Sequence, residues 1–341
     1  MSRDERRLTS FDVAARAGVS QSTVSRALSG SPTITEATRL RVMEAARELG
    51  YVVDERAARL RSGVSKTIAV VVIGRPGQGA ASVNPFYYSL LGSVCTAAAT
   101  LGYQSLVSIQ SDPEQFFGQF IERGQADAVV VLGTATNRAA WDYFSEYRLS
   151  QSNLAFWGAP FDGPGYVRSD NHAGARLAVE RLVAGGYRRI AFIGETDGAQ
   201  RQFRERYEGY RSALEAAGLP PLAAVTAAGA TREEQGAGAI AALRAADSAF
   251  DAVFSACDAM ALGALGALRD AGLSVPDQIG VIGFDGLGVG AHSSPPLTTI
   301  EPDFAEAGLN LVEAALGGAN DDRDRRVSVA LVERASARAP R

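Results

Sequence analysis

Residues 9–28 read TSFDVAARAGVSQSTVSRAL, and this stretch decides the fold of the N-terminal part of the chain. Thr9 and Asp12 match a capping box, because Thr9 can cap the first helical turn while the Asp12 carboxylate lies near the positive end of the helix. Gly18 then interrupts the apolar stripe, and Ser20 can cap a second short helix that ends with this stretch. Two short helices joined by a glycine-containing turn are typical of a helix-turn-helix unit.

The outer face of the second helix is polar. It carries short or hydrogen-bonding side chains at Gln21, Ser22, Ser25 and Arg26, and a third helix is expected over about residues 35–49. A helix with such a face can lie in the major groove of DNA and reach the base edges. A plain three-helix bundle without a ligand is the alternative, because such triplets of helices are common.

Charge is divided unevenly along the chain. Residues 1–63 hold 11 Arg, no Lys and 8 acidic residues, which gives a net charge of +3. The remaining 23 basic and 30 acidic residues give −7. A basic N-terminal part on an acidic remainder indicates that the first part meets a polyanion, although the excess is modest.

Length and composition exclude several classes of protein. A chain of 341 residues with 46% apolar and 21% charged residues is typical of a globular protein with two or three structural units. It has no uninterrupted apolar stretch long enough to span a membrane. The charged start, residues 1–7, lacks the apolar run of a secretory signal, so we expect a cytoplasmic protein. Two Cys and two His are too few for a disulfide framework or a His-rich metal site.

From Thr67 onward, apolar runs alternate with helical patterns, which predicts an α/β body. We expect strands at 68–73, 105–107, 128–132, 190–193, 252–254 and 279–282. We expect helices at 86–101, 114–123, 171–185, 203–217, 232–244 and 258–271. This pattern indicates two parallel sheets, and ligands of such sheets bind beyond the carboxyl ends of the strands. Phe86, Trp157, Asp258 and Asp285 are therefore ligand candidates, with an ordinary loop or capping role as the alternative for each.

Motifs of the common enzyme classes do not occur. Lys66, the one lysine of the chain, follows Ser65 rather than Gly, so there is no P-loop. Gly74, Gly77 and Gly79 follow the first expected strand with the wrong spacing for a dinucleotide turn, and no Gly-x-Ser-x-Gly elbow is present. We therefore expect a protein that is not an enzyme and that uses neither a cofactor nor a metal ion.

The chain resembles the lactose-repressor/galactose-repressor (LacI/GalR) family of bacterial transcription regulators over about residues 9–338. The matching segments lie in both parts of the chain. They are Asp12–Leu28, Thr38-Arg39, Leu49–Tyr51, Asn84–Phe86, Ser169–Asn171, Gly185–Ala191, Arg206–Tyr210, Asp258–Ala261, Gly283–Asp285 and Pro296–Ile300. The resemblance implies a small all-α helix-turn-helix domain and an α/β two-lobed body like that of periplasmic binding proteins, which dimerises and holds an effector between its lobes.

The resemblance divides the chain into a helix-turn-helix head (residues 1–53), a hinge helix and linker (54–66) and the body (67–341). The body's first lobe would comprise about 67–167 and 300–325, and its second lobe about 168–299 and 326–341. On the head, the resemblance places base contacts at Gln21, Ser22 and Arg26, and phosphate contacts at Thr9, Ser20, Thr23 and Ser25.

In the family, the hinge helix enters the minor groove. Leu60 matches the leucine wedge that opens the central base step, and Ala57 is its small neighbour. Asp54 stands where relatives often have Asn, and a carboxylate near phosphates is unfavourable, so the hinge is expected to be less stable or shifted in register.

In the body, Arg206 and Asp285 match positions that hydrogen-bond sugar hydroxyls in relatives. Phe86, Trp157 and Phe304 would supply an apolar face for a sugar ring. Asp258 is a weaker candidate contact that could simply cap the following helix. Cys257 stands where sugar-binding relatives often have a polar residue, which departs from the usual effector pattern.

Together, these residues predict a sequence-specific DNA-binding transcription regulator, a repressor of carbohydrate-utilisation genes under the control of a sugar-type effector. A transport-type solute receptor and a cytoplasmic sugar-converting enzyme are the alternatives for the same body. Because no leucine-heptad tail follows Arg338, we expect a homodimer on a pseudo-palindromic operator rather than a tetramer built on such a tail.

Overall fold

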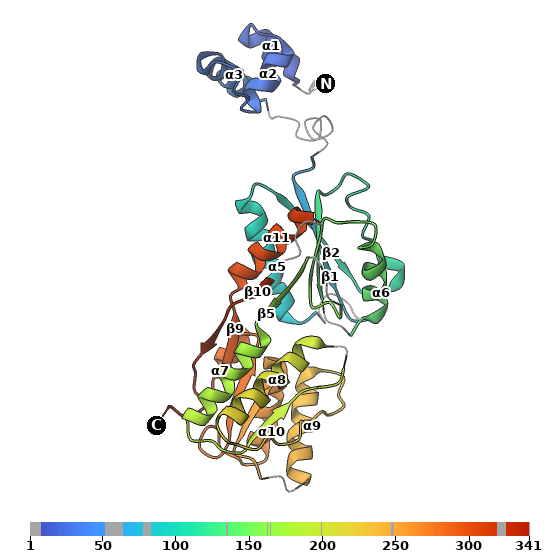
Figure 1. The fold of residues 1–341 in the computed structure, drawn as a ribbon. Coiled ribbons are helices and arrows are strands. Elements are labelled where there is room, and N and C mark those ends of the chain that lie inside the picture. Colours follow the sequence, from blue (N-terminus) through green and yellow to red (C-terminus); the bar gives the residue numbers. More distant parts are fainter. Residues whose placement is uncertain are drawn as a thin grey trace, which may run out of the picture. The chain divides into compact units, whose positions relative to one another are not determined.

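The computed structural model describes residues 8–51, 64–77, 83–133, 136–161, 163, 165–198, 200–246, 249–318 and 325–340. The chain divides into two compact units, Met1–Val64 and Ser65–Arg341. Across the described residues, no helix has both the length and the apolar character needed to cross a membrane. Figure 1 shows a helical first unit and a second unit of sheets flanked by helices.

The first unit contains the predicted helices as α1 (Ser10–Ala17), α2 (Gln21–Leu28) and α3 (Glu36–Leu49). Its core is small and apolar, and its fully buried side chains include Val13, Val24 and Val42. The predicted capping box is confirmed, because the Thr9 backbone N–H donates to Asp12 Oδ2 at 2.8 Å. Ser20 Oγ accepts from the Thr23 backbone N–H at 3.2 Å, which begins α2 as predicted. Gly18, at φ +64°, ends α1 in a conformation that favours glycine.

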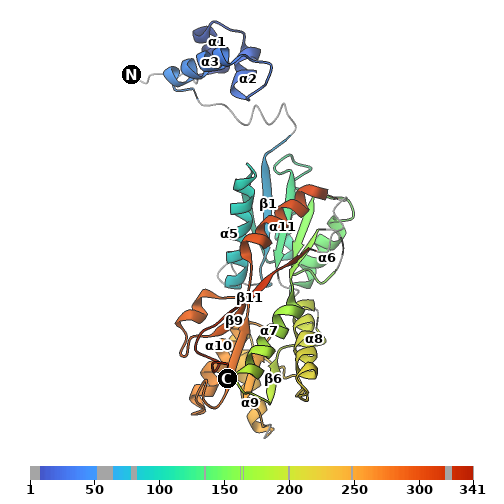
Figure 2. The ribbon, with the colours of Figure 1, turned by 60° about the vertical axis from the view of Figure 1, so that its left-hand side comes forward.

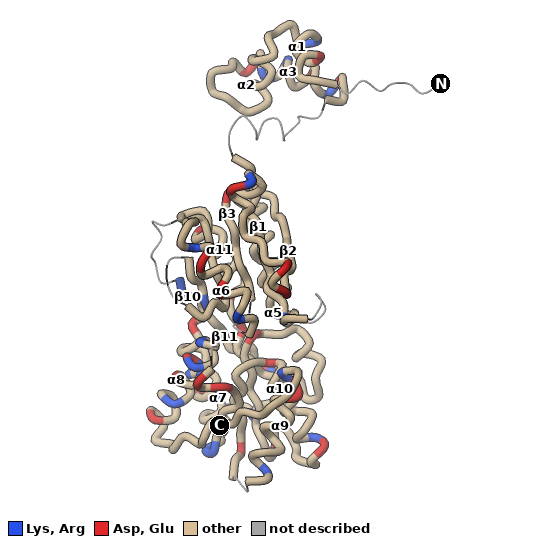
Figure 3. Tube along the Cα trace, turned by 90° about the vertical axis from the view of Figure 1, so that its right-hand side faces the viewer, with Lys and Arg blue, Asp and Glu red and all other residues tan. Residues whose placement is uncertain are grey.

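The second unit is built on two sheets, and the first is parallel throughout in the order β10-β5-β4-β3-β1-β2. Its strands are β1 (Thr67–Ile73), β2 (Gln104–Gln110), β3 (Ala128–Gly133), β4 (Leu154–Trp157), β5 (Tyr166–Ser169) and β10 (Arg325–Val327). Even-numbered residues of β1 pack against α5 (Pro85–Thr100) and α11 (Phe304–Gly317), which lie together in Figure 2. Odd-numbered ones pack against α6 (Arg138–Tyr147). Burial on both faces explains the uncharged β1 and β3, which are tan in Figure 3.

The second sheet has the order β11-β9-β8-β7-β6. Its strands are β6 (Ile190–Ile193), β7 (Ala252–Ser255), β8 (Gly280–Phe284), β9 (Thr298–Pro302) and β11 (Val329–Val332). Helices α7 (Asn171–Ala184) and α8 (Arg201–Ala216) pack together, as do α9 (Arg232–Ala245) and α10 (Asp258–Asp270). The prediction of two parallel sheets is wrong at one edge, because β11 runs antiparallel to β9. After β9 the chain leaves the second sheet for α11 and β10 of the first sheet, and β11 begins when the chain returns. The neighbouring strands β9 and β11 therefore run in opposite directions.

The chain passes between the two sheets at Asp170, Asp303 and Ser328. Asp170 N–H donates to the carbonyl of Val327, and Asp303 N–H donates to that of Ser328, both at 2.9 Å. Asp170 and Asp303 also cap α7 and α11 with their side chains. These crossings lie a few residues after the lobe boundaries that the resemblance implies, and they tie the three connecting segments together.

The predicted helix at 114–123 is wrong. Pro113–Gln115 forms a short 3₁₀ helix, and turns follow it up to Gly124, at φ +63°. The Gln110 side chain accepts from the Phe117 N–H and donates to the Phe117 carbonyl, both at 2.9 Å. The side chain at the end of β2 therefore satisfies the backbone groups of Phe117, which a helix would have paired internally.

Candidate functional site

The exposed face of α2 carries the predicted base-contacting residues. Ser22 and Arg26 are exposed, and within the described head Arg26 makes no ion pair. Gln21 is half-buried, because its Nε2 donates to Ser10 Oγ of α1 at 3.2 Å. The hydrogen-bonding side chains of Ser22, in the first turn of α2, and Arg26, in its last turn, are thus exposed, while Gln21 links α2 to α1.

The predicted phosphate-contacting residues gather at helix starts. Thr9 precedes α1, and its hydroxyl donates to Asp12 Oδ2 at 2.7 Å. Ser20 precedes α2, and its Oγ lies 2.9 Å from Thr23 Oγ1. Ser25 is half-buried one turn further on. Helix starts present free backbone N–H groups and a positive dipole end, which suits contact with phosphate. Ala57 and Leu60 lie outside the described residues.

A cavity lies in the body between the two sheets, and both sheets contribute to its wall. It brings together four predicted effector residues: Phe86 and Trp157 from the first-sheet side, and Arg206 and Asp285 from the second-sheet side. Its other lining residues are Ile73, Gly74, Arg75, Val83, Asn84, Tyr87, Thr136, Gly158, Tyr166, Arg168, Ser169, Asn171, Gln200, Gln202, Phe203, Arg232 and Cys257. Many of these follow a strand or begin a helix, as expected for ligand sites of parallel sheets.

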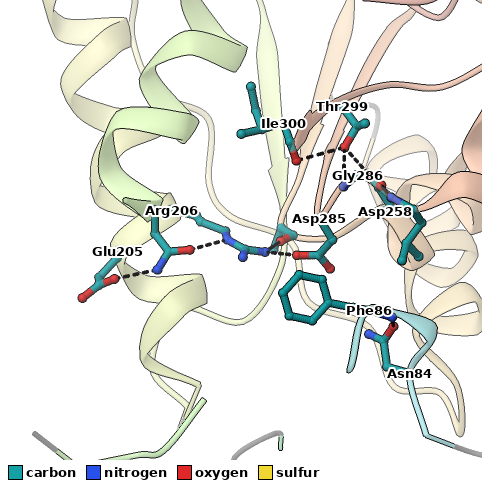
Figure 4. Close-up of polar contacts among 12 residues, drawn as sticks. Asn84, Phe86, Glu205, Arg206, Asp258, Asp285, Gly286, Thr299 and Ile300 are labelled. Carbon is teal, nitrogen blue, oxygen red and sulfur yellow. Dashed lines mark hydrogen bonds and ion pairs between the residues drawn. The ribbon is translucent and has the colours of Figure 1, made fainter. Parts of the chain in front are cut away.

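The centre of the second-sheet side is a buried ion pair. Arg206 of α8 donates from Nη1 to Asp285 Oδ1 at 3.1 Å, and its Nε donates to Asn171 Oδ1 at 2.9 Å (Figure 4). The guanidinium also stacks 3.6 Å from the ring centroid of Phe284 and donates to the Ala256 carbonyl. With both charged side chains buried, the pair is held in one orientation, which suits recognition of hydroxyl groups.

Asp285 is strained and only partly stabilised as an anion. It directly follows β8 at φ +119°, a conformation that side chains other than glycine rarely adopt. Burial raises its pKa to about 6, although Arg206 and Arg232 act in the opposite direction. A backbone held in such a conformation beside a cavity is typical of a functional residue.

Asp258 supports the site from behind, since it does not line the cavity. Its Oδ1 accepts from Thr299 Oγ1 at 2.6 Å, and its Oδ2 accepts from the Leu287 N–H at 2.7 Å. These bonds fix the loop that carries Asp285. Burial, together with the neighbouring Asp285 charge, raises the pKa of Asp258 to about 7. Asp258 is thus a positioning residue in this geometry.

Aromatic rings form the opposite, first-sheet wall. The Phe86 ring lies 5.9 Å from Trp157 and 5.4 Å from Tyr87, measured between ring centroids. Phe304 packs 5.5 Å from Phe86 but does not line the cavity, so it supports that ring from the core side. The Tyr87 hydroxyl donates to the Gly133 carbonyl at 2.9 Å. Of the three rings predicted to face a sugar, Phe86 and Trp157 therefore line the cavity, and Phe304 lies behind them.

Several polar lining residues were absent from the sequence prediction, chief among them Arg75, Arg168, Asn171, Gln200 and Arg232. The sequence did hold a signal for two of them, because Arg75 follows the first predicted strand and Arg232 is the first residue of the helix predicted at 232–244. The rule that ligands lie beyond strand ends selects such positions, but it selects many ordinary loop residues as well.

Two family models match the chain. The model of bacterial regulatory proteins of the lacI family matches residues 11–54, and a periplasmic binding protein-like domain matches residues 179–337. The HTH-type transcriptional regulator CelR of Thermobifida fusca is 33% identical over 303 residues, which cover 86% of this chain and 87% of CelR. The chain belongs to the LacI family.

Other LacI-family proteins are similar along nearly the same length. The ribose operon repressor of Escherichia coli (strain K12) is 33% identical, over 88% of this chain and 89% of its own. A solved transcriptional regulator CelR–cellobiose complex is 29% identical with a TM-score of 0.63, over 97% of this chain and 100% of that chain. These relatives are transcription regulators rather than enzymes. This LacI-family chain is accordingly a DNA-binding transcription regulator with a helix-turn-helix head.

Proposed function

We propose that this LacI-family regulator represses carbohydrate-utilisation genes and that a sugar or sugar derivative in the interlobe cavity changes its affinity for the operator. The observation that carries the proposal is the buried Arg206–Asp285 pair, which faces the same cavity as the rings of Phe86 and Trp157. A bidentate polar group opposite an apolar face suits a ring that has hydroxyls at its edge and C–H groups on its face. That one relative was solved with cellobiose supports a carbohydrate ligand.

For the head, we propose that α2 lies in the major groove. Gln21, Ser22 and Arg26 would read bases there, with Thr9, Ser20, Thr23 and Ser25 on the phosphates. The exposed Ser22 and Arg26 support this arrangement. Gln21 would exchange its hydrogen bond to Ser10 for a base edge, and a bidentate base contact is worth about 1–3 kcal/mol of discrimination.

For residues 54–66, we propose a hinge helix over 54–62 followed by a linker, with Leu60 entering the minor groove beside Ala57. The Leu60→Ala variant should bend an operator fragment less than wild type does in a gel-mobility bending assay. A matched Leu149→Ala variant, at a residue of the body that is 82% exposed, should leave the bend unchanged. An unchanged bend in Leu60→Ala would reject the wedge.

We propose a homodimer that binds a pseudo-palindromic operator. The first sheet ends at the edge strand β2, whose Leu106, Val107 and Ile109 are 39%, 46% and 37% exposed. Open apolar strand edges favour pairing with another chain. A two-fold dimer would match the symmetry of two operator half-sites.

The transport-type receptor and the sugar-converting enzyme are not favoured. The match of residues 11–54 to the lacI family gives the chain a DNA-binding head, for which neither alternative has a use. We place the protein's action in the cytoplasm, together with the DNA that it binds, and we expect no catalysis by the cavity residues.

The test is selection of bound DNA from a random pool, followed by gel retardation at low salt. The proposal predicts a pseudo-palindromic consensus and a change in retention with some members of a panel of mono- and disaccharides and their derivatives. Electrostatic, sequence-independent binding weakens steeply with salt, so the selected site must outcompete unrelated DNA as salt rises. No preference for any sequence would contradict the proposal.

A further inference from the structure

The cavity wall has more positive than negative charge. Among its described lining residues are the four arginines Arg75, Arg168, Arg206 and Arg232, but Asp285 is the one carboxylate. A neutral sugar needs polar groups of both kinds in balance, whereas uncompensated cations in a partly enclosed site favour an anion. The charge available to a ligand depends on which of these arginines already have a carboxylate partner.

Two of the four are compensated. Arg206 is paired with Asp285 at 3.1 Å. Arg168 Nε lies 3.4 Å from Glu205 Oε1, and the same carboxylate oxygen lies 2.9 Å from Arg201 Nε. These contacts form a network in which the carboxylates hold their arginines against the cavity wall.

Arg75 and Arg232 are different, because their observed acceptors are uncharged. Arg75 Nη1 donates to the Ala230 carbonyl at 2.8 Å, and Arg232 Nη1 donates to Gln235 Oε1 at 2.7 Å. Within the part of the chain that the structure describes, neither forms an ion pair with a carboxylate. Both side chains are half-buried, so water screens their charges less than it would on an open surface.

These two arginines come from opposite sides of the cavity. Arg75 follows β1 of the first sheet, while Arg232 is the first residue of α9 beside the second sheet. The bond from Arg75 to Ala230 reaches across to the segment that immediately precedes α9. Two cations on facing walls repel each other when the cavity holds no anion, and an anion between them would draw the two sides together.

A second observation points to a ligand at the same wall. Gln200, the N-cap residue of α8, is 5% exposed, and its Nε2 donor has no hydrogen-bond partner among the described residues. It lines the cavity with Asn84, Asn171, Arg232 and Cys257, which stand at the starts of α5, α7, α9 and α10. A buried amide donor without an acceptor is costly, and converging helix starts add positive partial charge.

We propose that the effector is a sugar-sized anion whose phosphate ester or carboxylate binds between Arg75 and Arg232, with its body against Phe86 and Trp157. This inference rests on the proposed effector role of the cavity. The anionic group would bridge the two lobes and favour their closure, so the charge of the ligand, in addition to its hydroxyl pattern, would control the regulator. Gln200 would donate to the same anionic group or to the hydroxyl beside it.

The experiment uses the full-length chain and matched ligands. Glucose, glucose 6-phosphate and glucuronate form one set, and ribose and ribose 5-phosphate form another, while inorganic phosphate is the probe for the anion site alone. Binding is followed by thermal unfolding of the body, with potassium chloride at equal ionic strength as the control for general salt effects. The phosphate and carboxylate arms separate the two sources of the anionic group.

We expect saturable stabilisation of the wild-type body by inorganic phosphate, and at least about tenfold tighter binding of one anionic sugar than of its neutral parent. The Arg75→Gln/Arg232→Gln double variant should lose both effects, and Arg232→Lys should retain part of them. Arg269→Gln removes a cation at an exposed residue of α10 and should behave as wild type.

Failure of this inference can be told from failure of the proposed function. One outcome is that neutral sugars stabilise the body and alter operator binding while their anionic forms bind no better. This would refute the proposed anion site and leave the proposed function, a sugar-responsive regulator, intact. If no anion, free or sugar-borne, stabilises wild type more than the double variant, the inference is likewise overturned. If no DNA sequence is selected, the proposed function itself fails, whatever the anion result.

Discussion

The head and the interlobe cavity place their functional side chains in opposite ways. On α2, the candidate base-reading residues Gln21, Ser22 and Arg26 lie within two helical turns and are exposed or half-buried. In the cavity, Phe86 and Asp285 come from distant parts of the chain and are buried. A single short helix is enough to present the residues of α2. The cavity residues come together only when both sheets and the three segments that cross between them are folded. Disturbing the cavity should therefore affect the stability of the whole body, whereas changing the exposed side chains of α2 should affect mainly DNA binding.

The largest effect is expected for Arg206→Ala. It leaves Asp285 buried without its ion-pair partner, and removing one member of such a pair costs about 3–5 kcal/mol. Both tryptophans, Trp141 and Trp157, lie in the body, so their fluorescence during urea unfolding reports the body alone. The exposed control Arg269→Ala should unfold with wild type, and equal stability of Arg206→Ala would contradict the structural role of the pair.

Arg26→Ala should weaken operator binding by about 1–3 kcal/mol without loss of fold, because the side chain is exposed and contributes nothing to the head's core. Fluorescence anisotropy with a labelled operator measures the affinity, and circular dichroism checks the helices. Arg41→Ala, at an exposed residue of α3, is the matched control for loss of one positive charge. Normal affinity in Arg26→Ala would remove this residue from the recognition surface.

Asp258→Asn should flatten the pH dependence of body stability. The pKa of Asp258 is about 7 in the folded body, against an ordinary value of 3.8, so protonation favours the folded state. This stabilisation is present at low pH and is lost as pH rises through 7, which costs wild type roughly 1 kcal/mol between pH 6 and pH 8. Asparagine carries no such charge, and Asp270→Asn, at an exposed carboxylate, is the control. Parallel pH profiles of wild type and Asp258→Asn would refute the assignment.

The smallest expected effect is that of Ser20→Ala on the head. Loss of the cap that receives the Thr23 N–H costs roughly 1 kcal/mol, so hydrogen exchange at the α2 amides should accelerate several-fold. Ser22→Ala changes a neighbouring exposed serine and should weaken DNA binding with little effect on exchange. Equal effects of Ser20→Ala and Ser22→Ala on both hydrogen exchange and DNA binding would contradict the separate roles of Ser20 in capping and Ser22 in recognition.

The contrast between the two regions also explains what the sequence could predict. The three head helices and their caps follow from neighbours in sequence, and the structure has them where expected. Apolar runs predicted the strands β1, β2, β3, β6, β7 and β8 of the body, but not the strands β4, β5, β9, β10 and β11. The irregular structure of residues 114–123 could not be predicted in this way. The Gln110 side chain at the end of β2 hydrogen-bonds the backbone of Phe117 and so holds this segment out of a helix.

In the cavity, the segments that resemble the family located Phe86, Arg206 and Asp285, and the rule that ligands lie beyond strand ends located Trp157. The resemblance could not show that Asp258 and Phe304 lie behind the wall, since facing direction depends on how helices and loops pack. Nor could it pair Arg75 with the segment before Arg232, because that contact forms only between folded lobes.

The most direct test of the central claim is the operator affinity of full-length wild type and Asp285→Ala, measured by anisotropy on the selected operator during titration with the ligand that stabilises the wild-type body. Allosteric coupling is typically worth about 1–3 kcal/mol, so wild-type affinity should change at least about fivefold as the cavity fills. Under conditions in which its tryptophan fluorescence shows a folded body, Asp285→Ala should bind the operator as tightly as unliganded wild type and should not respond to the ligand. A full response in the variant, or none in wild type, would contradict the claim that the cavity controls the head.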